Sequence, residues 1–263
     1  MTPLNLANLN LILSSPHAGS EIPNGIPDRT PGGCRHNSTN ACTFHYNDTC
    51  ADDVRCPVTT VQDFASYDPL AELLAKELYE TYNVLPFVVV GNWNRKKIDF
   101  NREIVEATFQ HPNAIKAYHG YHGYIERAVK KINKNFNGKG LLIDLHQHAQ
   151  GRYTMVGMRL SGVQLNTNNL SCTSIERLIE LSCPDNRSEC IFGSKALGTF
   201  LESNGLGTAY PSLNNPKPEN KTFYRGGYIT NRYSSKINVI QTELSFVVRN
   251  EFEPKIESFV TKE

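Results

Sequence analysis

The feature that most constrains the fold of this chain is an apolar stretch, Gly140–His148, that ends in polar side chains. Its sequence, GLLIDLHQH, predicts a short β-strand. Because side chains alternate across a strand, Leu142, Asp144, His146 and His148 share one face. Open α/β sheets bind ligands at the carboxyl ends of their strands, and imidazole is a common zinc ligand. The stretch therefore predicts either a metal or catalytic site, or a strand end that enters solvent with ordinary surface histidines.

Three further apolar stretches are each followed by, or contain, polar groups. Residues 10–15 lead into His17 on a Pro/Gly turn, and residues 86–90 precede Asp99-Phe100-Asn101-Arg102. An arginine held by a carboxylate, beside an amide donor, can bind a substrate carboxylate at two points. Residues 238–248 predict a last strand that contains Glu243, which alternation alone places toward solvent. All these polar groups can lie on one rim of a single sheet.

Apolar residues at helical spacing predict helices in the intervening segments. One opens at Asp68-Pro69, a second covers residues 112–136, and a third runs from Ser194 to Ser203. His122 falls on the buried face of the second, where a lone histidine is usually a hydrogen-bonded core group. Residues 223–233 combine a glycine pair with aromatic side chains and arginines, which predicts a loop that either wraps a substrate or packs its tyrosines.

Composition excludes some function classes. The 263 residues suffice for one large domain or two small ones, and 27 Lys+Arg nearly balance 26 Asp+Glu. No basic stripe indicates a nucleic-acid partner, and no run of about 18 apolar residues predicts a membrane span.

Seven cysteines fall in two clusters within polar segments, and we expect disulfide-rich loop insertions at about residues 28–60 and 161–190. The pairing stays open, and the odd number leaves one thiol free or paired outside the chain. Structural zinc is disfavoured because no Cys-x-x-Cys occurs. Most of the Asn-x-Ser/Thr sequons lie in or beside these clusters, so we expect a secreted glycoprotein whose targeting segment is not part of this sequence. The sequons are at Asn37, Asn47, Asn169, Asn186 and Asn220.

The order of these features resembles the N-formylglutamate amidohydrolase family, within the zinc carboxypeptidase and aspartoacylase-like fold. The resemblance rests on six pieces and spans most of the chain apart from the two insertions. It implies a single α/β domain over residues 1–263, with a mixed central sheet flanked by helices and a catalytic Zn²⁺. The pieces are Pro16-His17-Ala18-Gly19, Asp99-Phe100-Asn101-Arg102, Tyr121-His122, Leu142-Ile143-Asp144-Leu145-His146, Gly226-Gly227-Tyr228-Ile229 and Gln241-Thr242-Glu243-Leu244.

The resemblance also implies roles for individual residues. His17 and His146 are the expected zinc ligands, and Glu243 is the expected general base that activates water. The family's glutamate three residues after the first histidine is replaced by Ser20, so the remaining ligand is Glu21 or, alternatively, Asp68. Asp144 is expected to orient an imidazole, and Arg95 or Arg102 to stabilise an oxyanion. The expected substrate-binding residues are Asn101, Arg102, His122, His148, Arg225 and Gly227.

The sequence thus predicts a secreted zinc-dependent hydrolase of an amide bond next to a free carboxylate. Its substrate is expected to be an N-acyl amino acid or a glutamate-type peptide. Two alternatives stay open at this point. One is a metallohydrolase that uses His146-Gln147-His148 in a TIM barrel. The other is a non-catalytic secreted binding domain that retains the hydrolase fold, which the Ser20 departure and the insertions favour.

Overall fold

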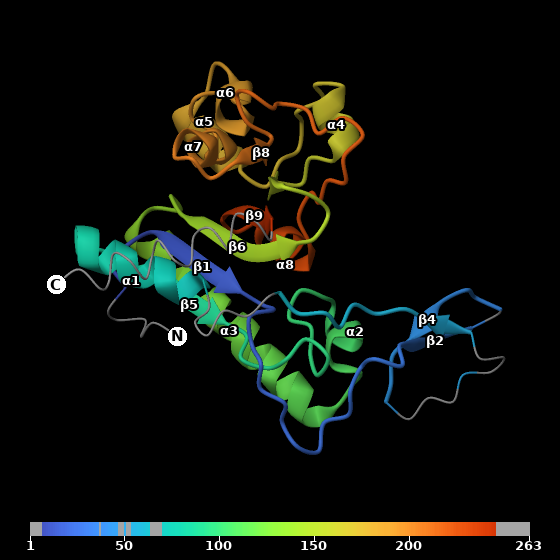
Figure 1. The fold of residues 1–263 in the computed structure, drawn as a ribbon. Helices are drawn as coiled ribbons and strands as arrows, with labels where there is room; N and C mark the ends of the chain where they lie inside the picture. Colours follow the sequence, from blue (N-terminus) through green and yellow to red (C-terminus); the bar gives the residue numbers. More distant parts are fainter. Residues whose placement is uncertain (1–6, 37, 47–49, 51–53, 64–69, 246–263) are drawn as a thin grey trace.

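A computed structural model describes residues 7–36, 38–46, 50, 54–63 and 70–245. Its centre is a six-stranded mixed sheet in the order β5-β1-β6-β9-β7-β8 (Figure 1). The described sheet is open, with β5 and β8 at its edges, so the TIM-barrel alternative is wrong. Its strands are β1 (Leu11–Ser15), β5 (Phe87–Val90), β6 (Leu141–His148), β7 (Tyr153–Gly157), β8 (Thr208–Tyr210) and β9 (Asn238–Ser245).

The four strands β5, β1, β6 and β9 are parallel, and β7 joins β9 antiparallel. The carboxyl ends of the four parallel strands therefore meet at one edge of the sheet. The register pairs Ser14 with Asp144, Asp144 with Gln241, and His146 with Glu243. Paired residues project from the same face, so this register gathers the polar groups of three strands in one place.

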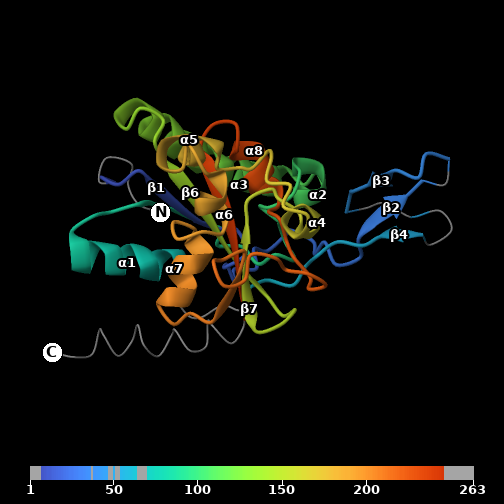
Figure 2. The same cartoon turned by 90° about the horizontal axis from the view of Figure 1, so that it is seen from above.

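Helices cover both faces of the sheet (Figure 2). On the face that carries Asp144 and His146, α3 (Pro112–Asn135) and α8 (Tyr228–Tyr233) pack over apolar side chains of β1, β5, β6 and β9. On the other face, α1 (Leu70–Tyr82) packs over β1 and β5. The short helix α2 (Ile104–Thr108) packs against α3. The predicted 112–136 helix is α3, and its predicted apolar face is buried.

The first cysteine-bearing segment forms a small antiparallel sheet. Its strands are β2 (Gly33–Arg35), β3 (Cys42–Thr43) and β4 (Arg55–Cys56), in the order β3-β2-β4. Two disulfides, Cys34–Cys50 and Cys42–Cys56, close it. In Figure 1 this sheet forms an arm that extends away from the body of the molecule.

The second cysteine-bearing segment is not the polar loop that its composition predicts. It contains α4 (Gly162–Asn166), α5 (Glu176–Ser182) and α6 (Arg187–Ile191), followed by α7 (Leu197–Ser203). Apolar side chains of these helices pack against Val156 and Ile240 of the sheet and form a second hydrophobic core. Cys183–Cys190 is the third disulfide, and Cys172 is the unpaired, exposed thiol among the described cysteines. No described helix is both long and apolar enough to cross a membrane.

Candidate metal centre

Three side chains converge at the carboxyl edge of the sheet: His17, Asp63 and His146. His17 follows β1 and His146 lies in β6, so adjacent parallel strands bring them together, with their ring centroids 4.9 Å apart. Asp63 comes from the stretch that follows β4. Its Oδ2 lies 4.0 Å from Nδ1 of His17 and 3.7 Å from Nδ1 of His146. The candidate ligand atoms all lie within 4.8 Å of one another.

Buried carboxylates fix which nitrogen each imidazole presents. Nε2 of His17 donates to Oδ1 of Asp99 at 2.7 Å, and Nε2 of His146 donates to Oδ2 of Asp144 at 2.8 Å. Asp144 is itself held by the hydroxyl of Ser14 at 2.6 Å. Metal-binding histidines commonly donate their other N–H to a carboxylate in this way. Both Nδ1 atoms therefore face Asp63, and Asp144 orients an imidazole as the sequence predicted.

The residues present fit a metal ion. Nδ1 of His17 is buried and has no hydrogen-bond partner among the described residues, although a buried polar atom normally has one. Zinc ligands about 2.0–2.1 Å from the ion lie about 3.4 Å apart in a tetrahedral site. The distances of 4.0 and 3.7 Å from Asp63 to the two imidazoles are only slightly wider. The group could therefore hold a metal ion.

The two histidines differ in proton affinity despite similar burial. Burial lowers the pKa of His17 to about 3, and the nearby Arg95 guanidinium opposes the effect of Asp99. Burial also lowers the pKa of His146, but Asp144, Glu243 and Asp63 outweigh it and raise that pKa to about 9. His17 is therefore neutral, as a metal ligand has to be, whereas a metal bound to His146 would have to displace a proton.

Glu243 lies beside this group and not in solvent. It is 6% exposed, because β9 is an inner strand that lies between β6 and β7. Nε2 of Gln241 donates to its Oε1 at 2.8 Å. Burial raises the pKa of Glu243 to about 7, since His146 only partly offsets the loss of water. A carboxylate with a pKa near neutrality is suited to accept and return a proton.

Asn101 and the glycine pair at the start of α8 both contact Gln241 of β9, and Asn101 also contacts α8 itself. Oδ1 of Asn101 accepts from the backbone N–H of Ile229 at 2.8 Å, and Oε1 of Gln241 accepts from that of Gly227 at 2.8 Å. A side chain at Gly227 would place its Cβ 2.5 Å from Nδ2 of Asn101. The close approach requires glycine there, and it fixes α8 over the site.

Two arginines from the segment after β5 lie near the candidate metal ligands. Arg95 donates from Nε to Oδ2 of Asp99 at 2.8 Å. Arg102 is held by Oε1 of Glu106 at 3.2 Å and by the carbonyl of Asn101 at 2.9 Å. The carboxylate that holds Arg102 is thus Glu106, whereas Asp99 of the predicted tetrapeptide holds Arg95 and His17. Arg102 remains partly exposed.

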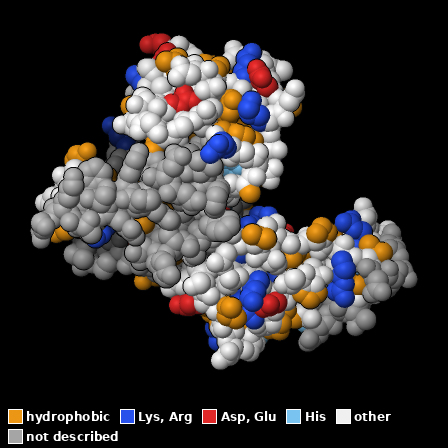
Figure 3. Space-filling model, viewed as in Figure 1, with side chains coloured by type: hydrophobic (Ala, Val, Ile, Leu, Met, Phe, Trp, Pro, Cys, Tyr) orange, Lys and Arg blue, Asp and Glu red, His pale blue; other side chains and the backbone are white. Residues whose placement is uncertain are grey.

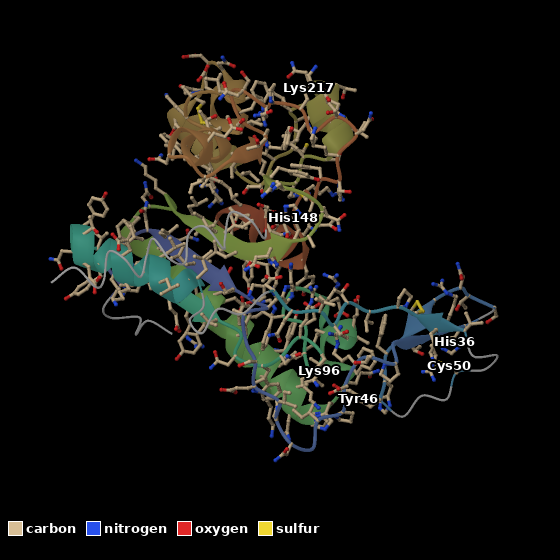
Figure 4. The ribbon with its side chains drawn as sticks, viewed as in Figure 1. His36, Tyr46, Cys50, Lys96, His148 and Lys217 are labelled. Carbon is tan, nitrogen blue, oxygen red and sulfur yellow. A yellow bond between two sulfur atoms is a disulfide. The ribbon has the colours of Figure 1, made fainter. Side chains whose placement is uncertain are left out.

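These groups line a cleft of about 580 Å³, within the size range of small-ligand sites. Figure 3 shows that the molecule is hollowed between the part that carries α4–α7 and the arm that carries β2–β4. Figure 4 places His148 at the end of β6, below the lobe with Lys217 and away from the arm with His36 and Cys50. The lining includes His17, Asp63, Arg95, Asn101, Arg102, His146, His148, Tyr224, Gly227 and Glu243.

His148 is placed in the cleft wall and not as a third imidazole ligand. Its Nε2 donates to the carbonyl of Tyr153 at 2.6 Å, and its Nδ1 accepts from the backbone N–H of Gln150 at 3.0 Å. Both ring nitrogens are therefore occupied. His146 and His148 lie on one face of β6, as alternation predicts, but their hydrogen bonds differ, and only His146 belongs to the candidate ligand group.

The structure does not bring Glu21 into the group, and Asp63 stands where the sequence predicted Glu21 or Asp68. Glu21 is exposed, and its backbone pairs with Trp93. Asp68 lies outside the described residues. Asp63 carries no motif in the sequence, where it is one of several acids that follow the first cysteine cluster, so only its position in space identifies it.

Other predicted residues lie away from the cleft or outside the described part. Arg225 is exposed and does not line the cleft, although its carbonyl accepts from the backbone N–H of Arg159. The sequons at Asn169, Asn186 and Asn220 are exposed. Those at Asn37 and Asn47 fall outside the described residues.

His122 lies in the core and does not line the cleft. Its Nε2 donates to the carbonyl of Phe100 at 3.1 Å, and its Nδ1 accepts from the hydroxyl of Tyr233 at 2.9 Å. It packs against the ring of Tyr118. His122 is thus the hydrogen-bonded core histidine that its helical position predicted, and the structure places it where it does not contact a ligand in the cleft.

His122 leads to a prediction about stability and pH. Burial lowers its pKa to about 3 from 6.5, so the unfolded chain binds the extra proton between these values. The wild-type free energy of unfolding therefore falls as pH drops from 6.5 toward 3, by at most about 1.4 kcal/mol per pH unit from this group. We expect His122→Phe to be about 1–3 kcal/mol less stable at pH 7 because Phe100 and Tyr233 lose a partner.

The difference in unfolding free energy between His122→Phe and wild type should shrink as pH falls from 6.5 to 4. Denaturant unfolding at a series of pH values measures it. A difference that stays constant or widens over this range would show that His122 is not held neutral in the folded protein.

A search of protein-family models, of curated proteins and of solved structures finds no match to this chain.

Proposed function

We propose that this protein is a secreted zinc-dependent hydrolase that cleaves an amide bond next to a free carboxylate. The observation that carries the proposal is the convergence of two carboxylate-oriented imidazoles, Asp63 and the buried Glu243 at one sheet edge. Two histidines and one carboxylate, with a separate acid nearby, are the donor set of catalytic zinc sites that keep a position open for water.

The residues of the chain divide the chemistry between them. His17, Asp63 and His146 would hold the ion, and Asp99 and Asp144 keep both imidazoles in the required tautomer. A bound zinc ion would supply Lewis acidity, which activates water and polarises a scissile carbonyl. Glu243 accepts the proton of the attacking water and returns it to the leaving amine.

The preference for a free carboxylate rests on Arg102. Its guanidinium lines the cleft, is held on one side by Glu106, and remains partly exposed on the other. A planar guanidinium binds a carboxylate through two parallel hydrogen bonds. The amide of Asn101 lines the same cleft, where its Nδ2 lies 3.4 Å from Oε1 of Gln241.

Secretion is supported by the three disulfides of the described residues and by the exposure of Asn169, Asn186 and Asn220. Disulfides persist in oxidising compartments. Substrates would then be extracellular N-acyl amino acids or peptides with a free terminal carboxylate.

Metal analysis and a substrate screen test this function. We expect about one zinc per chain in protein purified without chelators. We expect turnover of some N-acyl amino acids or carboxyl-terminal peptides, lost in His146→Ala together with the metal. Arg102→Ala should raise KM for a carboxylate substrate about 10- to 100-fold, because it removes a charge-assisted hydrogen-bond pair.

The matched control for Arg102→Ala is the same substrate with its carboxylate converted to a carboxamide. Wild type and Arg102→Ala should cleave this neutral substrate with similar kcat/KM. Equal KM values of both proteins for the carboxylate substrate would contradict the clamp, and metal-free, inactive wild-type protein would contradict the hydrolase.

A further inference from the structure

The stretch that supplies Asp63 has no regular secondary structure. It follows β4 directly, runs from residue 57 to residue 63, and pairs with no strand of the central sheet. The histidines, by contrast, are placed by β1 and β6. Among the described residues, side-chain contacts join this stretch to the rest of the protein.

Arg95 makes one such contact. Its Nη1 donates to the carbonyl of Val61 at 3.1 Å, two residues before Asp63. Arg29 also reaches the stretch, with Nη1 3.4 Å from the carbonyl of Thr59. Asn94 makes a third contact, in which its Nδ2 donates to Oε1 of Gln62. Of these three residues, Arg95 alone also contacts a group that supports a candidate ligand.

The same guanidinium also contacts the carboxylate that orients His17. Nε of Arg95 donates to Oδ2 of Asp99 at 2.8 Å, and Oδ1 of Asp99 accepts from Nε2 of His17 at 2.7 Å. Asp99 is fully buried and Arg95 is 9% exposed. A guanidinium is planar and rigid, so its two hydrogen bonds fix the spacing between the groups that accept them.

We propose that Arg95 is a positioning residue that sets the placement of Asp63 relative to His17, and so determines metal affinity. Its Nε donates to Asp99, which orients His17, and its Nη1 donates to the backbone of the stretch that carries Asp63. This role differs from the oxyanion-stabilising role that the sequence suggested. The inference rests on the proposed function only in requiring that the centre binds a metal.

Metal affinity measured by chelator competition tests the inference. We expect Arg95→Ala to bind Zn²⁺ about 10- to 100-fold more weakly than wild type, the usual effect of removing a group that supports a ligand. Arg95→Lys should lose less, because an ammonium keeps the charge and reaches one acceptor but not both. The matched control is Arg102→Ala, which removes a cleft arginine bonded to neither support and should keep wild-type metal affinity.

The visible absorption spectrum of the Co²⁺-loaded protein separates positioning from general destabilisation. Arg95→Ala should show a changed spectrum at full loading, because the geometry of the ligands is altered. A variant that is only less stable would keep the wild-type spectrum once loaded. If Arg95→Ala does not fold, Arg95→Lys, which retains the buried charge, is used for the same measurements.

A double-mutant cycle locates the effect. In an Asp63→Ala background, Arg95→Ala should weaken Zn²⁺ binding by a smaller factor than it does in wild type, because only the support of His17 remains to be lost. Wild-type affinity and Co²⁺ spectrum in both Arg95 variants, with kcat reduced, would overturn the inference and return Arg95 to a role at the substrate. Absence of Zn²⁺ binding by wild type would instead refute the metal centre itself.

Discussion

Replacing Asp63 by alanine is expected to weaken Zn²⁺ binding by about 100-fold or more, a larger loss than removal of a supporting group causes. Asp63 is the carboxylate that faces Nδ1 of both His17 and His146, at 4.0 and 3.7 Å. Without it, two imidazoles alone would hold the ion. Chelator competition on the purified full chain measures the change, and zinc content after dialysis gives a second readout.

Glu21→Ala is the matched control for Asp63→Ala. It removes a carboxylate that the sequence placed at the metal, but the structure has this side chain exposed and outside the group. We expect Glu21→Ala to bind Zn²⁺ as wild type does. If Glu21→Ala lost the metal while Asp63→Ala kept it, the ligand assignment from the structure would be wrong.

The second large effect is expected at Glu243. Glu243→Gln should reduce kcat about 100- to 10,000-fold and leave zinc content unchanged, because an amide of the same size cannot accept the proton of water. Glu243 lies beside His146 in the register, and Gln241 fixes its orientation. Steady-state kinetics on the best substrate of the screen and metal analysis of the same preparation measure both quantities.

Glu243→Asp distinguishes loss of the base from disturbance of the strand. It keeps a carboxylate on a shorter stem, so activity between that of wild type and Glu243→Gln is expected. Full activity in Glu243→Gln would eliminate the general base. Loss of zinc from Glu243→Gln would instead make Glu243 a ligand.

Local patterns in the sequence predict much of the sheet and of its polar edge. Alternation in residues 141–148 places Asp144, His146 and His148 on one face, and the register confirms that Asp144 and His146 project with their neighbours from β1 and β9. The same rule misplaces Glu243, which it assigns to solvent. Alternation gives only the face of a strand, and whether that face is covered depends on neighbours distant in the chain.

The second cysteine-bearing segment shows why part of the fold cannot be predicted from these patterns. Its helices α4, α5 and α6 are too short to develop a clear helical period among their polar residues. Leu165, Ile179 and Ile191 of these helices are buried in a cluster that includes Val156 and Ile240 of the sheet. The helix α8 is equally short, and the sequence predicted it as loop.

The sequence by itself indicated His17 and His146 as candidate site residues, because each lies in or just after an apolar strand and parallel strands end at one edge. Alternation alone assigned Glu243 to solvent, and its role as a base came from the family resemblance. Tertiary structure alone decided the third candidate ligand. Asp63 reaches the histidines from a stretch without secondary structure, which contacts Arg95, Arg29 and Asn94. It also decided that His17 and His146 bond Asp99 and Asp144 through Nε2 and turn Nδ1 toward Asp63, whereas both ring nitrogens of His148 are hydrogen-bonded elsewhere. Such contacts join residues that are far apart in the chain, so no local sequence pattern predicts them.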